Sequence, residues 1–328
     1  MELNQLEVFV CVAKNLSFSK AAEELYISQP SVSSKINSLE KALGAQLFVR
    51  NTKGVSLTKT GLEFLLHARK ILSLRDQAIH SVQGDDSNAA GVIDIISSTV
   101  PAQFLLPEII ASFTERRPNI VFRVEQSDSR RVEQEMRSFY YDFGMIGTAP
   151  DGDRFSFFPV YEDEFVLALQ SDALRGSDAA APDGAQCGSG SSLLDWAPVR
   201  ISPDDEAFNE FILRSPFIMR ETGSGTRKEI EALLSKIGVD PQALRIPAFF
   251  PDAHGVLLAV SRGMGVSLVS KVAAKMYVQA GLVTAVEFDS PLFRRNIYLL
   301  YNRESWLSPI QQAFADHARQ FYLGTVDS

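Results

Sequence analysis

The residues best suited to bind another molecule lie within the first 61 positions, on one face of a predicted helix. Ser28 is favourable at a helix start, Pro30 is tolerated in the first turn, and Gly44 is typical of a helix end. One apolar stripe runs between them, formed at helical spacing by Val32, Ile36, Leu39 and Leu43. Small, polar and basic side chains suit a helix that lies in the major groove of DNA. The opposite face carries such side chains: Gln29, Ser31, Ser33, Ser34, Lys35, Asn37, Ser38 and Lys41.

A shorter helix is predicted before this one, and a basic hairpin after it. The first helix covers residues 18–25, and a turn of about four residues joins the two helices, as in a helix-turn-helix. The segments 47–49 and 55–57 are short and apolar, and the turn between them predicts a β-hairpin, or wing. Arg50 and Lys53 on that wing are placed to meet phosphates, which supply most of the non-specific affinity for DNA.

A serine-rich outer face is also typical of an ordinary solvated helix, so that helix alone would not decide the function. Two helices and a basic wing within residues 17–61 together favour DNA binding. The formal net charge of −8 belongs to the rest of the chain, because residues 1–90 contain 10 Lys and Arg against 9 Asp and Glu. Local rather than total charge bears on contact with DNA.

A second set of polar residues follows predicted strands in the rest of the chain. Hydroxyl groups and free N–H groups at helix starts can hold a small anion. In open α/β domains, ligands bind at the carboxyl ends of the strands. Three segments fit this description: 97–99, 147–148 and 221–227. The candidate effector-binding residues are Ser98, Thr99, Thr148, Thr222, Gly223, Ser224 and His254. Taken singly, each hydroxyl is equally well explained as a helix cap.

Strand and helix patterns alternate beyond residue 90, which favours an α/β fold with a mainly parallel sheet. The predicted strands cover residues 92–97, 120–125, 143–147, 165–170, 216–219, 265–270 and 296–301. The predicted helices cover residues 102–115, 130–139, 226–236, 253–262 and 308–322. Residues 173–192, rich in Ala, Gly, Ser and Asp, are predicted to form a mobile surface loop that contains Cys187, a candidate oxidisable thiol.

A long helix is predicted between the two parts, from Lys59 to about Val82. Leu65, Leu72 and Ile79 are spaced by seven, and Arg75 interrupts the intermediate positions of this seam. The pattern fits either a dimerising linker helix or a helix packed on its own domain. The first is favoured, because helix-turn-helix proteins commonly read two half-sites about one DNA turn apart.

Other function classes find little support. His67, His80, His254 and His317 show no metal-ligand spacing with the cysteines, and no G-x-S-x-G motif occurs, so we expect no metal, no cofactor and no enzyme activity. No apolar run approaches the roughly 20 residues of a membrane span. No signal peptide is recognisable. Only two cysteines occur, which fits a reducing compartment, and we expect a cytoplasmic protein.

Residues 1–65 resemble the winged helix-turn-helix of LysR-type transcriptional regulators. The matching residues are Phe18, Ala21, Ala22, Leu25, Ser28, Gln29, Pro30, Ser31, Val32, Ser33, Ile36, Leu39, Glu40, Leu43, Gly44, Leu47, Phe48, Arg50, Leu57, Thr58 and Gly61. The chain departs from the family at Ser34, Asn37 and Ser38, where arginine is often found. By this resemblance, the DNA-binding residues are Ser28, Gln29, Pro30, Ser31, Ser33, Ser34, Lys35, Arg50 and Lys53.

The resemblance extends in layout over the whole chain and implies its organisation. We expect a DNA-binding domain at 1–60, a linker helix at 61–88 and a two-lobed effector domain, like a type 2 periplasmic binding protein, at 89–328. Lobe I would cover about 89–162 and 268–328, and lobe II about 163–267. The implied partners are a dyad-like operator in double-stranded DNA, a small and anionic effector, further copies in a homodimer or homotetramer, and RNA polymerase.

The sequence leaves open both the chemical class of the effector and the function itself. The hydroxyl-rich pocket is similar to that of family branches that sense sulfur- or selenium-related metabolites. The alternative function is a solute-binding or catalytic α/β protein whose N-terminal helices serve only assembly. A third reading is a repressor that needs no small ligand.

Overall fold

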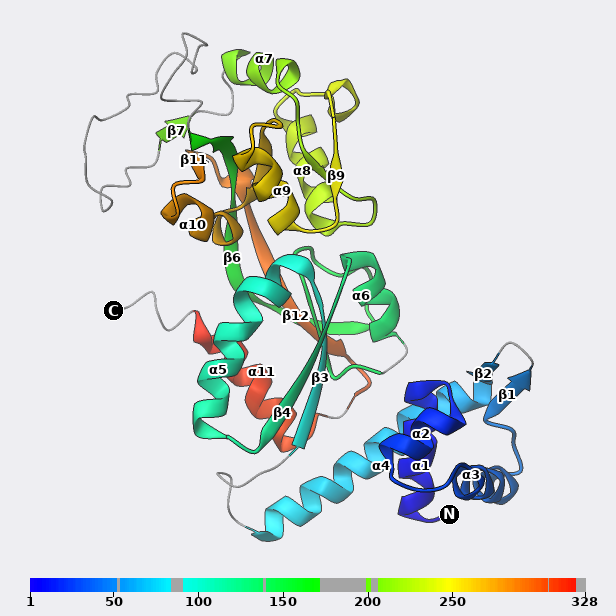
Figure 1. Ribbon diagram of the computed structural model, residues 1–328. Coiled ribbons are helices and arrows are strands. Elements are labelled where there is room, and N and C mark those ends of the chain that lie inside the picture. Colours follow the sequence, from blue (N-terminus) through cyan, green and yellow to red (C-terminus); the bar gives the residue numbers. More distant parts are fainter. Residues whose placement is uncertain are drawn as a thin grey trace.

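The structure, a computed structural model, shows a head, a long helix and two lobes (Figure 1). It describes residues 1–51, 54–83, 91–137, 140–171, 199–201, 206–305 and 307–322. The predicted loop 173–192, with Cys187, lies outside the described residues, as does Lys53. The α/β architecture with an N-terminal winged helix-turn-helix is confirmed.

The head has the predicted helix-turn-helix and wing. Its elements are α1 (Leu3–Asn15), α2 (Phe18–Glu24), α3 (Gln29–Leu43), β1 (Phe48–Asn51) and β2 (Gly54–Leu57). Serine caps begin both helices of the motif: Ser17 Oγ accepts the Lys20 N–H at 3.3 Å and Ser28 Oγ the Ser31 N–H at 3.4 Å. Gly44 ends α3 in the left-handed conformation, with φ +65°. The strands of the wing pair antiparallel.

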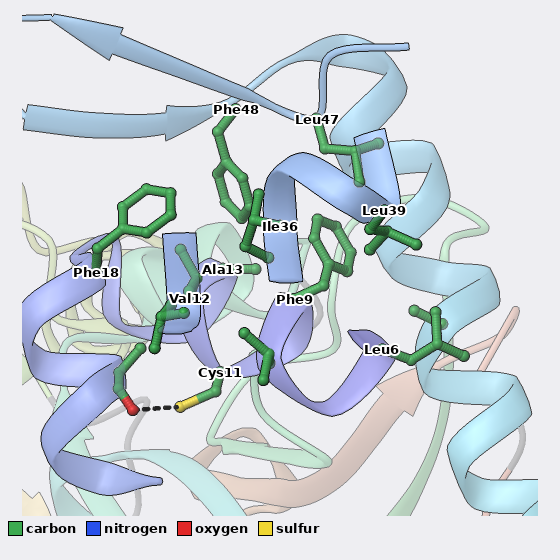
Figure 2. Packing of buried hydrophobic residues seen from close by; sticks show 14 of the residues in the cluster. Leu6, Phe9, Cys11, Val12, Ala13, Phe18, Ile36, Leu39, Leu47 and Phe48 are labelled. Carbon is green, nitrogen blue, oxygen red and sulfur yellow. Dashed lines mark hydrogen bonds between the residues drawn. The ribbon is translucent and has the colours of Figure 1, made fainter. Parts of the chain in front are cut away.

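Side chains from every helix of the head meet in one core (Figure 2). The Phe9 ring of α1 lies 5.4 Å from the Phe48 ring of the wing and 5.2 Å from the Phe64 ring of the next helix. Ile36 and Leu39, from the apolar stripe of α3, are fully buried in this core. Their burial fixes the orientation of α3 and leaves its polar face turned outward.

The linker helix α4 (Lys59–Gln83) is packed on the head over its first half. Leu65 and Ala68 are buried in the head core, and Arg75 pairs with Glu7 of α1. Ile79, in contrast, is 47% exposed. The predicted seam is therefore split: its N-terminal part is used within the chain, and its later part faces outward.

Lobe I is built on strands that run parallel to one another. Its elements are β3 (Gly91–Ser98), the π-helix η2 (Pro101–Leu105), α5 (Leu106–Arg116), β4 (Ile120–Ser127), α6 (Ser129–Met136), β5 (Phe143–Ile146) and α11 (Pro309–Phe321). β3 lies between β4 and β5 and pairs parallel with both. Helices α5 and α11 lie together on this lobe (Figure 1).

Two long strands join the lobes: β6 (Phe155–Gln170) and β12 (Arg294–Asn302) (Figure 1). Residues 155–164 of β6 pair with β12, and residues 165–170 pair with β10 and β11. Lobe II contains β7 (Val199–Ile201), α7 (Glu206–Arg214), β8 (Met219–Arg220), α8 (Gly225–Lys236), η4 (Pro241–Ala243), β9 (Phe249–Phe250), α9 (Ala253–Ser261), β10 (Ser267–Ser270), α10 (Lys271–Gln279), β11 (Val283–Phe288) and η5 (Pro291–Phe293).

Some expectations for this part need correction. The sheet is mixed rather than mainly parallel, because β6 pairs antiparallel with β10, β11 and β12. The strand predicted at 216–219 is reduced to β8, preceded by isolated bridges from Pro216 and Phe217. Elements β10, α10 and β11 pack in lobe II, so the chain returns to lobe I at β12 rather than at residue 268.

Within the described ranges, no helix has the length and apolar character needed to cross a membrane. The same ranges contain no group of three or more His, Cys, Asp or Glu side chains that could hold a metal ion.

The buried thiol of Cys11 provides a test of the head core. Its Sγ lies 3.8 Å from the Ala21 carbonyl oxygen (Figure 2), and burial raises the pKa of the thiol to about 11. Since only the thiolate reacts, we expect iodoacetamide at pH 8 to alkylate Cys11 about 100-fold more slowly in the folded chain than in denaturant. Peptide mass spectrometry measures both rates, and equal rates would show that this core is open in solution.

Candidate DNA-binding face and effector cleft

The outer face of α3 carries a shallow groove of about 520 Å³. It is lined by Gln29, Pro30, Ser33, Ser34, Asn37, Ser38 and Lys41. Gln29 Nε2 donates a hydrogen bond to Ser33 Oγ at 3.2 Å, one helical turn further on. This contact holds the Gln29 side chain against the outer face of α3. Short polar side chains around a groove leave room for base edges to approach the helix.

The other predicted DNA-binding residues lie around this groove. Ser28 caps α3, and Ser31 and Lys35 are partly buried beside the groove rather than in its lining. Arg50 is part of β1, the first strand of the wing, but its side chain lies outside the described part of the structure, as does all of Lys53.

Glu40, on α3, fixes the wing relative to this face. Its Oε1 accepts the backbone N–H groups of Leu47, at 2.7 Å, and Phe48, at 3.1 Å. A charged acceptor makes these hydrogen bonds stronger than neutral ones. Gly61 allows a similarly close approach on the other side, since a Cβ there would lie 2.0 Å from the Leu47 carbonyl oxygen. The wing is thus held between α3 and α4.

The second candidate site lies where the two lobes meet. We call it the inner cavity; it is lined by Ser98, Thr99, Val100, Pro101, Asp128, Ser129, Gly147, Arg220, Ser224, Gly225, Thr226, Arg295 and Ile297. Three helices begin at it: the helical segment after β3, α6 after β4, and α8 in lobe II. Helix starts present N–H groups and positive dipole ends, so they favour a negatively charged group.

Two buried arginines also reach the inner cavity. Arg220 of β8 is 4% exposed and binds Glu221 through Nε and Nη2, at 3.0 and 3.1 Å. Its Nη2 also donates across the lobes to Thr99 Oγ1 at 3.1 Å. In the described structure, its Nη1 has no hydrogen-bond partner, so this donor is available to a ligand.

Arg295 of β12 is held in the same way. Its Nε and Nη2 donate to Asp163 Oδ2 at 3.0 and 2.9 Å, and its guanidinium lies 4.4 Å from the Phe165 ring centre. Its Nη1 donates to Thr226 Oγ1 of α8 at 3.2 Å. Arg295 therefore connects the strand that joins the lobes to a helix start of lobe II.

The lobes are closed on each other at this point. The inner cavity has a volume of about 10 Å³, which is at the lower limit of roughly 10–15 Å³ needed for one water molecule. Gly225 lies directly against Ser129, because a Cβ at Gly225 would be 2.5 Å from Ser129 Oγ. Any larger ligand must separate the lobes to enter.

An outer groove of about 440 Å³ adjoins the inner cavity and shares Ser129, Ser224 and Gly225 with it. It lies between α6 of lobe I and α8 of lobe II, which face each other in Figure 1. Its other lining residues are Arg130, Glu133, Thr148, Asp151, Thr222, Gly223, Arg227, Lys228 and Glu231. The groove is therefore polar and contains charges of both signs.

The structure brings most of the predicted effector residues together. Ser98, Thr99 and Ser224 line the inner cavity, and Thr148, Thr222 and Gly223 line the outer groove. His254 lines neither. It is exposed on α9, where its ring hydrogen-bonds to the Tyr277 hydroxyl.

Among the residues with polar side chains that line the inner cavity, five were not predicted as effector-binding residues. Asp128 and Ser129 follow β4 and begin α6, so the same rule that selected Ser98 and Ser224 could have found them. Thr226 lies inside the segment 221–227 that was already selected. Arg220 ends β8 and directly precedes the segment 221–227, so the same rule could have included it. Arg295 carries no such local signal, because it occurs within β12.

Comparison with known families decides the class of the protein. The model described as "Bacterial regulatory helix-turn-helix protein, lysR family" matches residues 3–62, and the model described as "LysR substrate binding domain" matches residues 86–185 and 208–322. The chain belongs to the LysR family. It is a LysR-type transcriptional regulator with an effector-binding domain, and its relatives are regulators rather than enzymes.

Individual relatives and solved structures are similar over most of the chain. An uncharacterized HTH-type transcriptional regulator of Methanocaldococcus jannaschii is 30% identical over 302 residues, which are 92% of this chain and 93% of the relative. Full-length OxyR from Pseudomonas aeruginosa has the same fold, with a TM-score of 0.69 at 19% identity over 97% of this chain and 95% of that one. The regulatory domain of Synechocystis CcmR, solved in complex with 2-PG, covers 70% of this LysR-family chain and 97% of its own, with a TM-score of 0.55 at 19% identity.

The groove on α3 leads to a prediction about salt dependence. For operator binding, log K falls as log salt concentration rises. We expect Lys41→Gln to make this slope less steep by about 0.9, the value of one phosphate contact. Lys236→Gln, at the exposed end of α8 in lobe II, is the matched control and should leave the slope unchanged. Binding to the chain's own upstream DNA at several salt concentrations measures it, and equal slopes for all three proteins would remove Lys41 from the interface.

The contact between Gly225 and Ser129 gives a test of lobe closure. Alanine favours helices more than glycine does. A lower melting temperature for Gly225→Ala would therefore report the clash with Ser129. We expect a loss of about 1–2 kcal/mol, as the cross-lobe hydrogen bonds lengthen, and Gly225→Ala/Ser129→Gly should regain most of it relative to Ser129→Gly. If Gly225→Ala melts at or above the native temperature, the lobes are not closed here in solution.

Proposed function

We propose that this LysR-type regulator binds a dyad-like operator through the groove on α3 and the wing, and that a small effector with an anionic group binds between its lobes. The observation that carries the effector proposal is the convergence of three helix starts and two buried arginines on the inner cavity. An anion there would accept N–H hydrogen bonds from helix ends and from Arg220 Nη1. The CcmR regulatory domain, which shares this fold, was solved in complex with 2-PG.

Binding of such an effector changes the relation between the lobes. The inner cavity is too small for an organic anion, so the lobes must first separate. In the described residues the chain passes from one lobe to the other only along β6 and β12. An effector controls the regulator to the extent that it binds one arrangement of the lobes more tightly than the other. The hydrogen bonds Arg220–Thr99 and Arg295–Thr226 are the contacts it would replace or retain.

The arrangement on DNA requires more than one chain. A single head offers one recognition helix, whereas a dyad-like operator has two half-sites. The exposed later part of α4, with Leu74 at 58% and Ile79 at 47% exposure, supplies apolar surface for a second copy. We therefore propose a homodimer or homotetramer, with the DNA-binding domain at 1–60, the linker helix at 61–88 and the effector domain at 89–328.

A footprint combined with a ligand panel tests this function. Full-length protein should protect a dyad-like region upstream of its own gene, and an anion among acetate, glycolate, phosphate, sulfate and selenite should raise the melting temperature and alter the footprint. The charge-neutral variant Arg220→Met/Glu221→Gln should abolish the response to the anion and keep DNA binding.

The exposed ion pair of Glu210 and Arg214, also in lobe II, offers the matched control Arg214→Met/Glu210→Gln, which should respond as the native protein does. Absence of dyad-like protection contradicts the operator proposal. A response that persists in Arg220→Met/Glu221→Gln contradicts the placement of the effector between the lobes.

A further inference from the structure

The charges on the wall of the inner cavity are not those of a simple anion site. Only three charged side chains line it: Asp128, Arg220 and Arg295. Both arginines are already bound through Nε and Nη2 by carboxylates, Glu221 and Asp163. Asp128 has no such counterpart, because no described lysine, arginine or histidine forms an ion pair with it. The uncompensated side-chain charge facing this cavity is therefore negative.

The carboxylate of Asp128 is partly used and partly open. Asp128 Oδ1 accepts the Arg131 N–H at 2.9 Å and so caps α6, whereas Oδ2 has no hydrogen-bond partner among the described residues. Across the lobe boundary the carboxylate faces the backbone of Gly223, where a Cβ would lie 3.4 Å from Asp128 Cγ. An Asn or Ser side chain could cap α6 equally well, so capping alone does not require a charge at this position.

We infer that the effector is a zwitterion of the α-amino-acid type, with its carboxylate at the helix starts and Arg220 and its ammonium group at Asp128. This inference rests on the proposed function and narrows the class of effector. A dianion would place its second charge near Asp128 without a compensating cation, and like charges in a closed cavity repel strongly. An ammonium group instead supplies the charge and the donors that Asp128 Oδ2 can accept.

The outer groove indicates where the rest of such a molecule lies. It adjoins the inner cavity at Ser129, Ser224 and Gly225, so a side chain can extend into it when the α-carbon groups occupy the inner cavity. Its walls carry hydroxyls and charges of both signs, among them Thr148, Thr222 and Glu133, and desolvation by burial raises the pKa of the Glu133 carboxyl. These walls fit a polar side chain better than an apolar one.

Pairs of ligands that differ only in the ammonium group test this inference. Calorimetric titration of the full-length chain with the proteinogenic L-α-amino acids should find binding for one or more with polar side chains. The α-hydroxy acid counterpart of each, such as L-glycerate for L-serine, should bind roughly 10- to 100-fold more weakly. In Asp128→Asn, which keeps the α6 cap, the amino acid should lose about the same factor while the hydroxy acid changes little.

The control is Asp252→Asn at the N-cap of α9, where Asp252 Oδ1 accepts the Gly255 N–H at 2.7 Å away from the inner cavity; it should bind as the native chain does. If hydroxy acids or simple anions bind as tightly as amino acids, or if Asp128→Asn leaves the ratio unchanged, the zwitterion is wrong and the anionic-effector proposal stands. If no member of any series binds, both fail.

Discussion

The two-lobed domain depends on the buried ion pair between Asp163 and Arg295, which binds β6 to β12 where these strands pass between the lobes. Asp163 lies in β6 opposite Arg295 of β12, two residues before the pairing of β6 changes to β10 of lobe II. Both side chains are buried, and Ser270 Oγ donates to the remaining carboxylate oxygen at 2.8 Å. Removal of one partner from such a pair leaves an uncompensated buried charge, at a cost of about 3–5 kcal/mol. These contacts link β6, β12 and β10 at the junction between the lobes.

The same pair shows how the cleft can be ready for a ligand before one arrives. An arginine has five N–H donors, and a carboxylate that takes Nε and Nη2 fixes the plane of the guanidinium. Arg295 and Arg220 are both held in this way, and each also donates to a threonine that lines the inner cavity, Thr226 and Thr99 respectively. Their positions thus depend on protein carboxylates rather than on the ligand. A site organised in this way loses little side-chain freedom on binding.

Sequence reasoning succeeded where the signals are local. Ser28 and Gly44 mark the ends of α3, and two short apolar segments mark the wing. Ser98, Thr99 and Ser224 were found because strand ends and helix starts meet in α/β domains. Arg295 was not, since its partner Asp163 is 132 residues away in the chain. The direction of strand pairing was also mistaken, because a buried strand has the same apolar pattern whether its neighbours run parallel or antiparallel.

Ion pairs connect lobe I to the linker helix and to the DNA-binding head, so they bear on how a separation of the lobes could affect DNA binding. Arg69 of α4 pairs with Asp142 at 3.0 Å, and Asp142 also accepts the Asp94 N–H at the start of β3. Arg123 of β4 lies 3.6 Å from Glu24 of α2. Lobe I is thereby tied both to the linker helix and to the head, whereas lobe II has no ion pair to either in the described chain. Separation of the lobes around β6 and β12 would consequently move lobe II against a fixed frame of lobe I, α4 and head.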